Sequence, residues 1–258
     1  MLKVIKIGGN VVDNRPVLER FLDDLAGLDG PCILVHGGGK VATDISKALG
    51  IETTMIDGRR VTDHRTLEVV TMVYAGLVNK NIVASLQGRG IDAFGLCGAD
   101  GSAIISMRRS AGAVDYGFVG DPIPGECRTD TLSMLINGGY MPVIAPITHD
   151  GKGTLLNTNA DTVARTVAVA LSALYRVELI YCFEMAGVME RIDDPASLIP
   201  HIDPERYAVL RTKGIVSKGM IPKIDNAFDA IRAGVESVVI CSCEAIGKEN
   251  FTGTRITL

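Results

Sequence analysis

The stretch "LKVIKIGGN", residues 2–10, decides how the first element of this sequence is read. Apolar side chains dominate residues 2–7, a pattern typical of a strand that is buried on both faces. Lys6 stands near the end of this strand, and Gly8 and Gly9 follow it directly. The stretch therefore predicts a cationic side chain and an exposed backbone at the carboxyl end of a strand.

Strands alternate with helices along the rest of the chain. Further short apolar runs, edged by Gly, Pro or Asp, are predicted to be strands at Cys32–His36, Asp92–Cys97, Met141–Ala145, Glu178–Cys182 and Ser237–Cys241. This alternation indicates a mostly parallel sheet covered by helices on both faces. Ligands of such sheets bind outside the carboxyl ends of the strands.

Two helices and one irregular region complete the expected layout. A helical stripe over residues 67–82 is predicted to follow Thr62 as its N-cap, with Asp63 in the first turn, and a second helix should follow Asn159. Residues 101–128 alternate in polarity instead, which favours antiparallel hairpins beside a site.

Composition excludes several classes of protein. The chain has 258 residues, of which 47% are hydrophobic and 22% are charged, and its net charge is -4. Without a long run of Lys or Arg, we expect no nucleic-acid partner. We expect no membrane span either, since neither an apolar stretch of about 20 residues nor a signal-peptide pattern is evident. A cytoplasmic location is the expectation, with the six cysteines as reduced thiols.

A second glycine turn, "HGGGK" at residues 36–40, also lies between a predicted strand and a predicted helix. Consecutive glycines there let the backbone approach a ligand and direct its N–H groups at an anion, with support from the helix N-terminus. A tight turn that needs positive φ explains them equally well. The spacings G-x-G-x-x-G and G-x-x-x-x-G-K-[ST] do not occur at these glycines, so a dinucleotide fold or a P-loop is disfavoured.

Three further stretches carry polar groups near helix starts. "GRRVT" (58–62) offers an arginine fork suited to a carboxylate, or simply a surface pair. In "LNTNAD" (156–161), helix capping alone explains Asn159 and Asp161 but does not explain Asn157. In "KGMIPK" (218–223), Lys223 lies near a helix N-terminus, where a cation is unfavourable unless an anion compensates it.

Taken together, these groups contain no strong nucleophile or general base. Such a set suits phosphoryl transfer, where catalysis is mainly positioning and neutralisation of charge. A carboxylate acceptor, with a pKa of about 4.3, is already ionised near neutral pH and needs no base.

The stretches "KIGGN", "HGGGK", "GRRVT", "LNTNAD", "KGMIPK" and the terminal "GTRIT" (253–257) resemble, in order and spacing, those of acetylglutamate kinases in the amino-acid kinase superfamily. The resemblance implies an α/β fold, a three-layer αβα sandwich around a mainly parallel central sheet. It implies one domain over residues 1–258, with residues 1–156 binding the acylated amino acid and residues 157–258 binding ATP. It also implies a homodimer that uses ATP with Mg²⁺ to phosphorylate the side-chain carboxylate of an N-acylglutamate, in arginine biosynthesis.

The same resemblance assigns roles to individual residues. Two lysines would stabilise the transferring phosphoryl group and one aspartate would orient them: Lys6, Lys223 and Asp161. Residues that would hold the acceptor are Gly38, Gly39, Arg60 and Asn157. Residues that would contact the nucleotide are Gly8, Gly9, Glu184, Gly187 and Ser217. No residue is assigned to a metal, because Mg²⁺ would arrive on the phosphates of ATP.

Some points depart from the family or stay open. Glu184 in "CFEMAGV" (182–188) replaces the usual aspartate, and Lys218 is also unusual. The acyl group could be acetyl or larger, such as succinyl. A kinase of the same superfamily for aspartate, glutamate, carbamate or uridylate, or a non-catalytic ligand sensor, would share part of the pattern. Since only five residues precede Lys6, we expect no N-terminal helix and a dimer that is insensitive to arginine.

Overall fold

An eight-stranded central sheet organises the computed structural model, which describes residues 1–56, 58–191, 193–216, 220–247 and 252–258. The strand order is β12-β14-β13-β11-β1-β2-β8-β5. The strands are β1 (Leu2–Ile7), β2 (Cys32–His36), β5 (Ala93–Cys97), β8 (Met141–Ala145), β11 (Val177–Phe183), β12 (His201–Ile202), β13 (Ser237–Ser242) and β14 (Gly253–Ile256). Among the strands that the structure describes, the β13–β14 pair is antiparallel and the other neighbouring pairs are parallel, so the mainly parallel sheet predicted from the sequence is confirmed.

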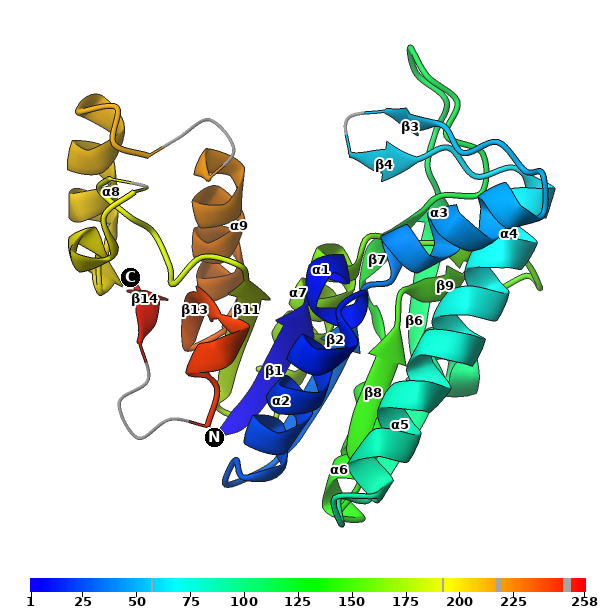
Figure 1. Cartoon of the computed structure of the whole chain (residues 1–258), viewed down its shortest axis with the longest axis horizontal. Coiled ribbons are helices and arrows are strands. Elements are labelled where there is room, and N and C mark those ends of the chain that lie inside the picture. Colours follow the sequence, from blue (N-terminus) through cyan, green and yellow to red (C-terminus); the bar gives the residue numbers. More distant parts are fainter. Residues whose placement is uncertain (57, 192, 217–219, 248–251) are drawn as a thin grey trace.

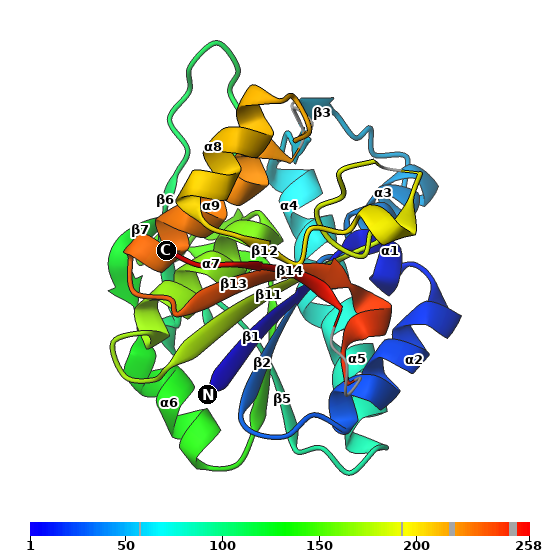
Figure 2. The ribbon, with the colours of Figure 1, turned by 90° about the vertical axis from the view of Figure 1, so that its left-hand side faces the viewer.

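Helices cover both faces of this sheet, which gives the three layers of the expected αβα sandwich (Figures 1 and 2). On one face lie α6 (Thr129–Asn137), α7 (Ala160–Leu171), α8 (Pro204–Thr212) and α9 (Ile221–Arg232). On the other lie α1 (Gly9–Val12), α2 (Arg15–Ala26), α3 (Gly39–Ala48), α4 (His64–Thr71) and α5 (Asn79–Gln87). A hydrophobic core lies on each face of the sheet, and successive strand residues point to opposite faces. Val4 packs into the first core and Ile5 into the second.

The predicted helix over residues 67–82 is one continuous helical segment, in which α4 and α5 are joined by a π-helical stretch, η1 (Met72–Val78). The predicted N-cap is wrong: Asp63, not Thr62, caps α4, because its carboxylate accepts the backbone N–H of Thr66. The segment His64–Gln87 is also long and apolar enough to cross a membrane by length and composition alone, a test that the core helix of a soluble protein also passes. Its buried side chains, such as Val70 and Val73, belong to the second core, which accounts for its apolar character.

A smaller sheet and a hairpin stand beside the carboxyl ends of the central strands. The sheet has the order β10-β9-β6-β7, formed by β10 (Leu155–Asn157), β9 (Ile147–His149), β6 (Ile104–Arg108) and β7 (Gly120–Cys127). The antiparallel β6–β7 pair confirms the hairpin predicted in residues 101–128. The hairpin β3 (Met55–Ile56) and β4 (Arg59–Arg60) lies above α3 in Figure 1. Short 3₁₀ turns occupy Asp100–Ser102, Pro195–Ser197 and Cys243–Ala245.

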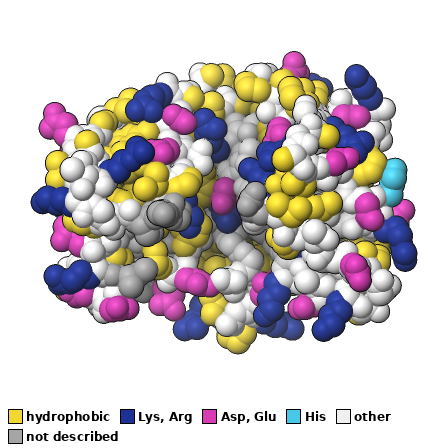
Figure 3. Space-filling view, turned by 90° about the horizontal axis from the view of Figure 1, so that it is seen from above, with side chains coloured by type: hydrophobic (Ala, Val, Ile, Leu, Met, Phe, Trp, Pro, Cys, Tyr) yellow, Lys and Arg dark blue, Asp and Glu magenta, His cyan; other side chains and the backbone are white. Residues whose placement is uncertain are grey.

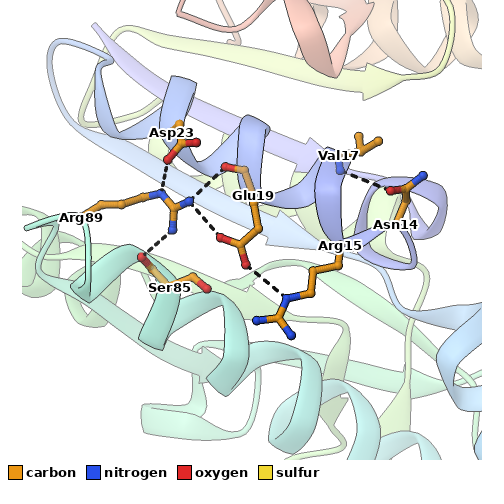
Figure 4. Close-up of polar contacts among 7 residues, drawn as sticks. All are labelled: Asn14, Arg15, Val17, Glu19, Asp23, Ser85 and Arg89. Carbon is orange, nitrogen blue, oxygen red and sulfur yellow. Dashed lines mark hydrogen bonds and ion pairs between the residues drawn. The ribbon is translucent and has the colours of Figure 1, made fainter.

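Two helices of the second layer are joined by one arginine (Figure 4). The Arg89 guanidinium lies 2.7 Å from a carboxylate oxygen of Asp23 and 2.9 Å from one of Glu19, both on α2. It also donates to the carbonyl of Ser85 on α5 at 2.9 Å. These contacts hold α2 against α5. Both helices belong to the layer that also contains α1 and α3, the helices that follow the two glycine turns.

Candidate active site

The two glycine turns lie against each other at the carboxyl ends of β1 and β2. The N–H of Gly37 donates to the carbonyl of Ile7 at 3.1 Å. A Cβ placed on Gly37 would lie 3.2 Å from the backbone nitrogen of Gly9, closer than most real Cβ contacts. Residues 8–9 and 37–39 therefore form one continuous backbone surface, which a side chain at position 37 would push apart.

A pocket opens on the side of this surface that faces the β3–β4 hairpin. All four residues that the sequence assigned to the acceptor line it, namely Gly38, Gly39, Arg60 and Asn157, together with Gly37, Met55, Gly58, Arg59, Tyr74, Val119, Pro146, Thr158, Asn159 and Ala160. Gly38 has a φ of 152°, and a Cβ there would lie 3.2 Å from the Tyr74 ring. We call this cavity the acceptor pocket.

Arg60 is buried in the acceptor pocket and held by several acceptors. Its Nη2 lies 2.7 Å from the carbonyl oxygen of Gly39 and 2.9 Å from Oγ1 of Thr43. Its Nη1 donates to Oγ1 of Thr53 at 3.2 Å. A guanidinium carries five N–H donors, and these contacts use some of them to tie Arg60 to the glycine turn, to α3 and to Thr53.

Asn157 is held by a residue for which the sequence suggested a different role. Its Nδ2 donates to Oγ1 of Thr62 at 3.0 Å, and the Thr62 hydroxyl in turn donates to the carbonyl of Arg60 at 2.8 Å. Thr62 is fully buried, and a Cβ on Gly117 would lie 2.2 Å from its carbonyl oxygen. Thr62 therefore fixes the Asn157 amide with its oxygen as the free acceptor, and it ties Asn157 to the strand of Arg60.

Lys6 and Asp161 form an ion pair at the end of β1. The Nζ of Lys6 lies 2.7 Å from Oδ1 of Asp161, which stands in the first turn of α7. A Cβ on Gly8 would have this Nζ as its nearest neighbour, at 3.9 Å. Seen from above, the molecule is hollowed between its two halves, and side chains of both charges show in the hollow (Figure 3).

Lys223 approaches the same place from α9, and both lysines lie near one aromatic ring. Its Nζ lies 3.7 Å from the centre of the Phe183 ring, and that of Lys6 lies 5.5 Å from the same centre. Burial lowers the pKa of Lys223, and the nearby Lys6 lowers it further, while Asp161 opposes both effects. Phe183 thus presents its π face to both cations, an arrangement in which the ring quadrupole attracts positive charge.

A second cavity, which we call the phosphate-side pocket, lies on the α9 side of the first glycine turn. Three predicted nucleotide residues and one predicted catalytic lysine line it, namely Gly8, Gly9, Glu184 and Lys223, with Asn10, Val11, Cys182, Phe183, Met185, Met220 and Ile240. The Asn10 amide donates to the Glu184 carboxylate across this pocket. This contact directs the Glu184 carboxylate toward α1, the helix that contains Asn10.

The last two predicted nucleotide residues differ in how far the structure describes them. A Cβ on Gly187 would lie 2.6 Å from Oγ1 of Thr254 and 2.7 Å from Leu198, so tight packing explains a glycine there. Its contact with nucleotide stays a prediction. Ser217 and Lys218 lie outside the described residues.

Sequence reasoning missed Phe183, Tyr74 and Thr62. Tyr74 was included in a helical stripe and Thr62 at a helix start, where nothing in the local pattern separates a pocket residue from a core or capping residue. A signal did exist for Phe183, because it lies in the stretch 182–188 that departs from the family. Tyr74 gains its role from Gly38 and Thr62 gains its role mainly from Asn157, which are distant in the sequence, and a linear pattern does not show such contacts.

Comparisons with known proteins agree on one family. The model of the amino acid kinase family matches residues 1–242. The chain is 52% identical to the acetylglutamate kinase of Cytophaga hutchinsonii over 260 residues, covering 99% of this chain and 98% of that protein. It is also 52% identical to the acetylglutamate kinase of Bacteroides fragilis over 257 residues, covering 99% and 96% of the two chains.

The fold has a solved counterpart as well. An N-acetylglutamate synthase from Neisseria gonorrhoeae, complexed with coenzyme A and N-acetyl-glutamate, superposes with a TM-score of 0.81 at 22% identity, covering 100% of this chain and 59% of the other. That likeness concerns the fold alone. The family model and the identities over nearly the whole chain establish that this chain belongs to the amino acid kinase family, in its acetylglutamate kinase branch.

Proposed function

We propose that this chain transfers the γ-phosphoryl group of ATP to the side-chain carboxylate of N-acetylglutamate or a close acyl analogue, as a step of arginine biosynthesis. One observation carries the proposal: the acceptor pocket, with its buried Arg60, adjoins the glycine turns next to the Lys6–Asp161 ion pair. This juxtaposes a carboxylate-binding cation with groups suited to a transferring phosphoryl group.

The acceptor pocket suits an N-acylated amino acid. Arg60 offers its remaining N–H donors to the α-carboxylate, and the free oxygen of the Asn157 amide accepts the N–H of the acylated nitrogen. The N–H groups of Gly38 and Gly39 are then left for the reacting carboxylate. The apolar neighbours Met55, Tyr74 and Val119 line the remainder of this pocket.

The chemical step then needs charge neutralisation rather than a base. An oxygen of the ionised acceptor carboxylate attacks the γ-phosphorus, the bond from that phosphorus to the bridging β,γ-oxygen breaks, and ADP leaves with the electron pair. No proton has to move. Lys6 and Lys223 stabilise the charge on the moving group, while Asp161 holds Lys6 in place.

We assign nucleotide binding to the phosphate-side pocket. We assign residues 1–156 to the acceptor lobe and residues 157–258 to the nucleotide lobe, with some mixing at the site, since Asn157 lines the acceptor pocket and Gly8 lines the other. The described residues hold no group of three or more His, Cys, Asp or Glu arranged for a metal. Magnesium would be bound by phosphate oxygens and water, and it would neutralise phosphate charge.

We further propose a cytoplasmic homodimer formed along β5. This strand ends the strand order of the central sheet, and edge strands offer unpaired backbone groups. Phe94 on β5 and the neighbouring Tyr140 are each 46% exposed, and their rings pack edge to face at 6.0 Å. Such an exposed aromatic pair is typical of an interaction surface.

The activity is tested by measuring ADP release with MgATP and a panel of acceptors: N-acetylglutamate, N-succinylglutamate, glutamate and aspartate. We expect turnover with an N-acylglutamate and very little with the free amino acids, because these carry a charged ammonium group where Asn157 would accept an amide N–H. Equal or higher turnover with aspartate or glutamate would contradict the proposed acceptor. Ligand binding without any turnover would instead favour a sensor.

A further inference from the structure

We propose that His36, held as one neutral tautomer by Asn79, is a positioning residue that fixes the glycine turn 37–39 of the acceptor pocket. This inference deepens the proposed function and rests on it for its kinetic consequences. Its structural part concerns one imidazole and one amide, which can be observed without turnover.

His36 lies at the end of β2 and is fully buried. Both of its ring nitrogens have a polar neighbour: Nδ1 lies 2.7 Å from the carbonyl oxygen of Gly37, and Nε2 lies 3.1 Å from Nδ2 of Asn79. A carbonyl oxygen only accepts, so Nδ1 must carry a proton. Whether Nε2 also carries one depends on which atom of Asn79 faces it.

The orientation of the Asn79 amide is fixed by two other groups. Its Nδ2 lies 2.9 Å from the carbonyl oxygen of Val143, a partner that requires a donor. Its Oδ1 lies 3.0 Å from Nζ of Lys80, a partner that requires an acceptor, and the same Nζ donates to the carbonyl of Gly95 at 3.1 Å. The NH₂ group therefore faces His36, and Nε2 must be the unprotonated acceptor. A single tautomer satisfies every contact.

The surrounding backbone makes room for this amide. Asn79 is fully buried, and a Cβ on Gly95 would lie 2.2 Å from its Oδ1 and 2.7 Å from Nζ of Lys80. Only a glycine on β5 leaves that space. Strand β5 thus belongs to the support of the glycine turn although it lies two strands away from β2.

The π-helical stretch explains how one helix supports the turn twice. The N–H of Asn79 bonds to the carbonyl of Tyr74, five residues earlier. In an α-helix, residues five apart point about 140° away from each other, whereas the wider π turn brings them closer to one face. Tyr74 then lies against Gly38, and Asn79 lies against His36.

The contact of His36 with Gly37 affects the direction of the Gly38 N–H, one of the groups proposed to bind the reacting carboxylate. Gly37 is held from one side by the imidazole, and it lies against Gly9 on the other. Its carbonyl direction sets the plane of the following peptide, and hence the direction of the Gly38 N–H. Burial keeps the imidazole neutral by lowering the pKa of His36 to about 4, with the Lys80 cation acting in the same direction.

The test compares two substitutions that each retain one of the two hydrogen-bonding positions of the imidazole. His36→Asn places an amide N–H near the Nδ1 position and retains the donor to Gly37, whereas His36→Gln reaches the Nε2 position and retains only the partner of Asn79. We expect His36→Gln to lower kcat by roughly 10- to 100-fold with little change in the KM for ATP, the scale of a misplaced reacting group. His36→Asn should restore kcat to at least tenfold above the Gln variant. His201→Gln is the control for a His→Gln change, because His201 is exposed on β12.

Nitrogen-15 NMR of the wild-type imidazole gives a readout that a purely structural role would not move. We expect a protonated Nδ1 and an unprotonated Nε2 from pH 5.5 to 8. Asn79→Asp should protonate Nε2, because a carboxylate oxygen would then face it. If the tautomer inverts, Nδ1 loses its proton and the donor to Gly37 is lost, so kcat should fall as in the Gln variant, whereas a doubly protonated ring keeps that donor and should keep kcat well above the Gln variant.

A wild-type ring protonated at Nε2, equal kcat for the Asn and Gln variants, or full activity of an Asn79→Asp variant whose Nδ1 is unprotonated would each overturn the inference. Should the variants fail to fold, the wild-type tautomer alone decides. Should the wild type show no turnover with any acceptor, the proposed function fails, and the amide NMR signals of Gly37–Gly39 in the Gln and Asn variants then test the positioning role separately.

Discussion

Two cations share one anion and one aromatic ring at the centre of the site. Lys6 contacts the Asp161 carboxylate, and both Lys6 and Lys223 face Phe183. Placing two ammonium groups together is unfavourable without compensation, and here the carboxylate and the π face provide it. A γ-phosphoryl group that arrived here would neutralise the remaining positive charge. The arrangement is therefore suited to stabilising the negative charge on a phosphoryl group during its transfer.

Lys6→Met is predicted to reduce kcat by roughly 10²- to 10³-fold, the range observed when one preorganised electrostatic partner is lost. The fold should survive, because Asp161 keeps 42% of its side chain exposed and can be solvated when its partner is removed. Lys3→Met is the matched control, since Lys3 lies on the same strand with its amine on the carbonyl of Asp29. Steady-state kinetics and thermal melts on both variants check this, and near-normal kcat in folded Lys6→Met would rule the role out.

The pH profile reports on Lys223. Its protonated form is the useful one, and its pKa is lowered by burial, so kcat of the wild type should decline as pH rises through that lowered pKa, below the range of an ordinary lysine. Lys223→Arg keeps its charge far above this range, so its kcat should be lower near pH 7.5 but flat up to about pH 10. Lys213→Arg, at the exposed end of α8, is the control. The same alkaline decline in Lys223→Arg would mean that another group titrates.

Most residues of the candidate site could be predicted from the sequence because they stand in short continuous stretches. Lys6, Gly38, Arg60 and Asn157 were each marked by a strand end, a glycine run or a polar residue that capping did not explain. His36 and Asn79 could not be linked in this way, since 43 positions separate them and each fits an ordinary strand or helix. Their relation depends on how the sheet and the long helix pack.

At the scale of elements, the sequence predicted the strands better than the helix ends. Buried parallel strands are continuous apolar runs, and all six predicted strands match the observed ones to within one residue at each end. The α4 cap was misplaced by one residue because Thr62 and Asp63 are both good caps and only the structure shows which carries the bond. The π stretch within residues 64–87 keeps the apolar spacing of an α-helix, so periodicity did not reveal it.

The docking of α2 on α5 gives a prediction about stability. Arg89→Ala removes contacts to Asp23, Glu19 and Ser85 at once, and we expect it to lower the free energy of unfolding by roughly 1–3 kcal/mol. Arg15→Ala is the control: Arg15 has an 89% exposed side chain and only a 3.8 Å contact to Glu19, so its effect should stay within about 0.5 kcal/mol. Urea unfolding at low salt measures both, and equal midpoints for the two variants would contradict the docking role.

At the scale of the whole molecule, the edge of the central sheet is where a second copy would bind. Strand β5 ends the strand order, with Phe94 and Tyr140 exposed beside it. The adjoining long helix adds Met72 and Leu77, which are 57% and 47% exposed. Apolar side chains gathered at an unpaired strand favour burial in an interface over contact with water.

Light scattering should therefore give a mass of twice the 27.4 kDa chain for the wild type. Phe94→Asp places a charge on this surface, where burial without a partner is costly, so we expect it to shift the protein to the monomer at micromolar concentration. Val209→Asp is the matched control, because Val209 is similarly exposed at 50% but lies on α8, which packs beside β12 at the opposite edge of the sheet. Thermal melts of both variants separate dissociation from unfolding. A monomeric wild type, or a dimer that persists in folded Phe94→Asp, would show that β5 is not the interface, since a charge buried in an apolar contact without a partner should open it. A hexamer would contradict the predicted dimer.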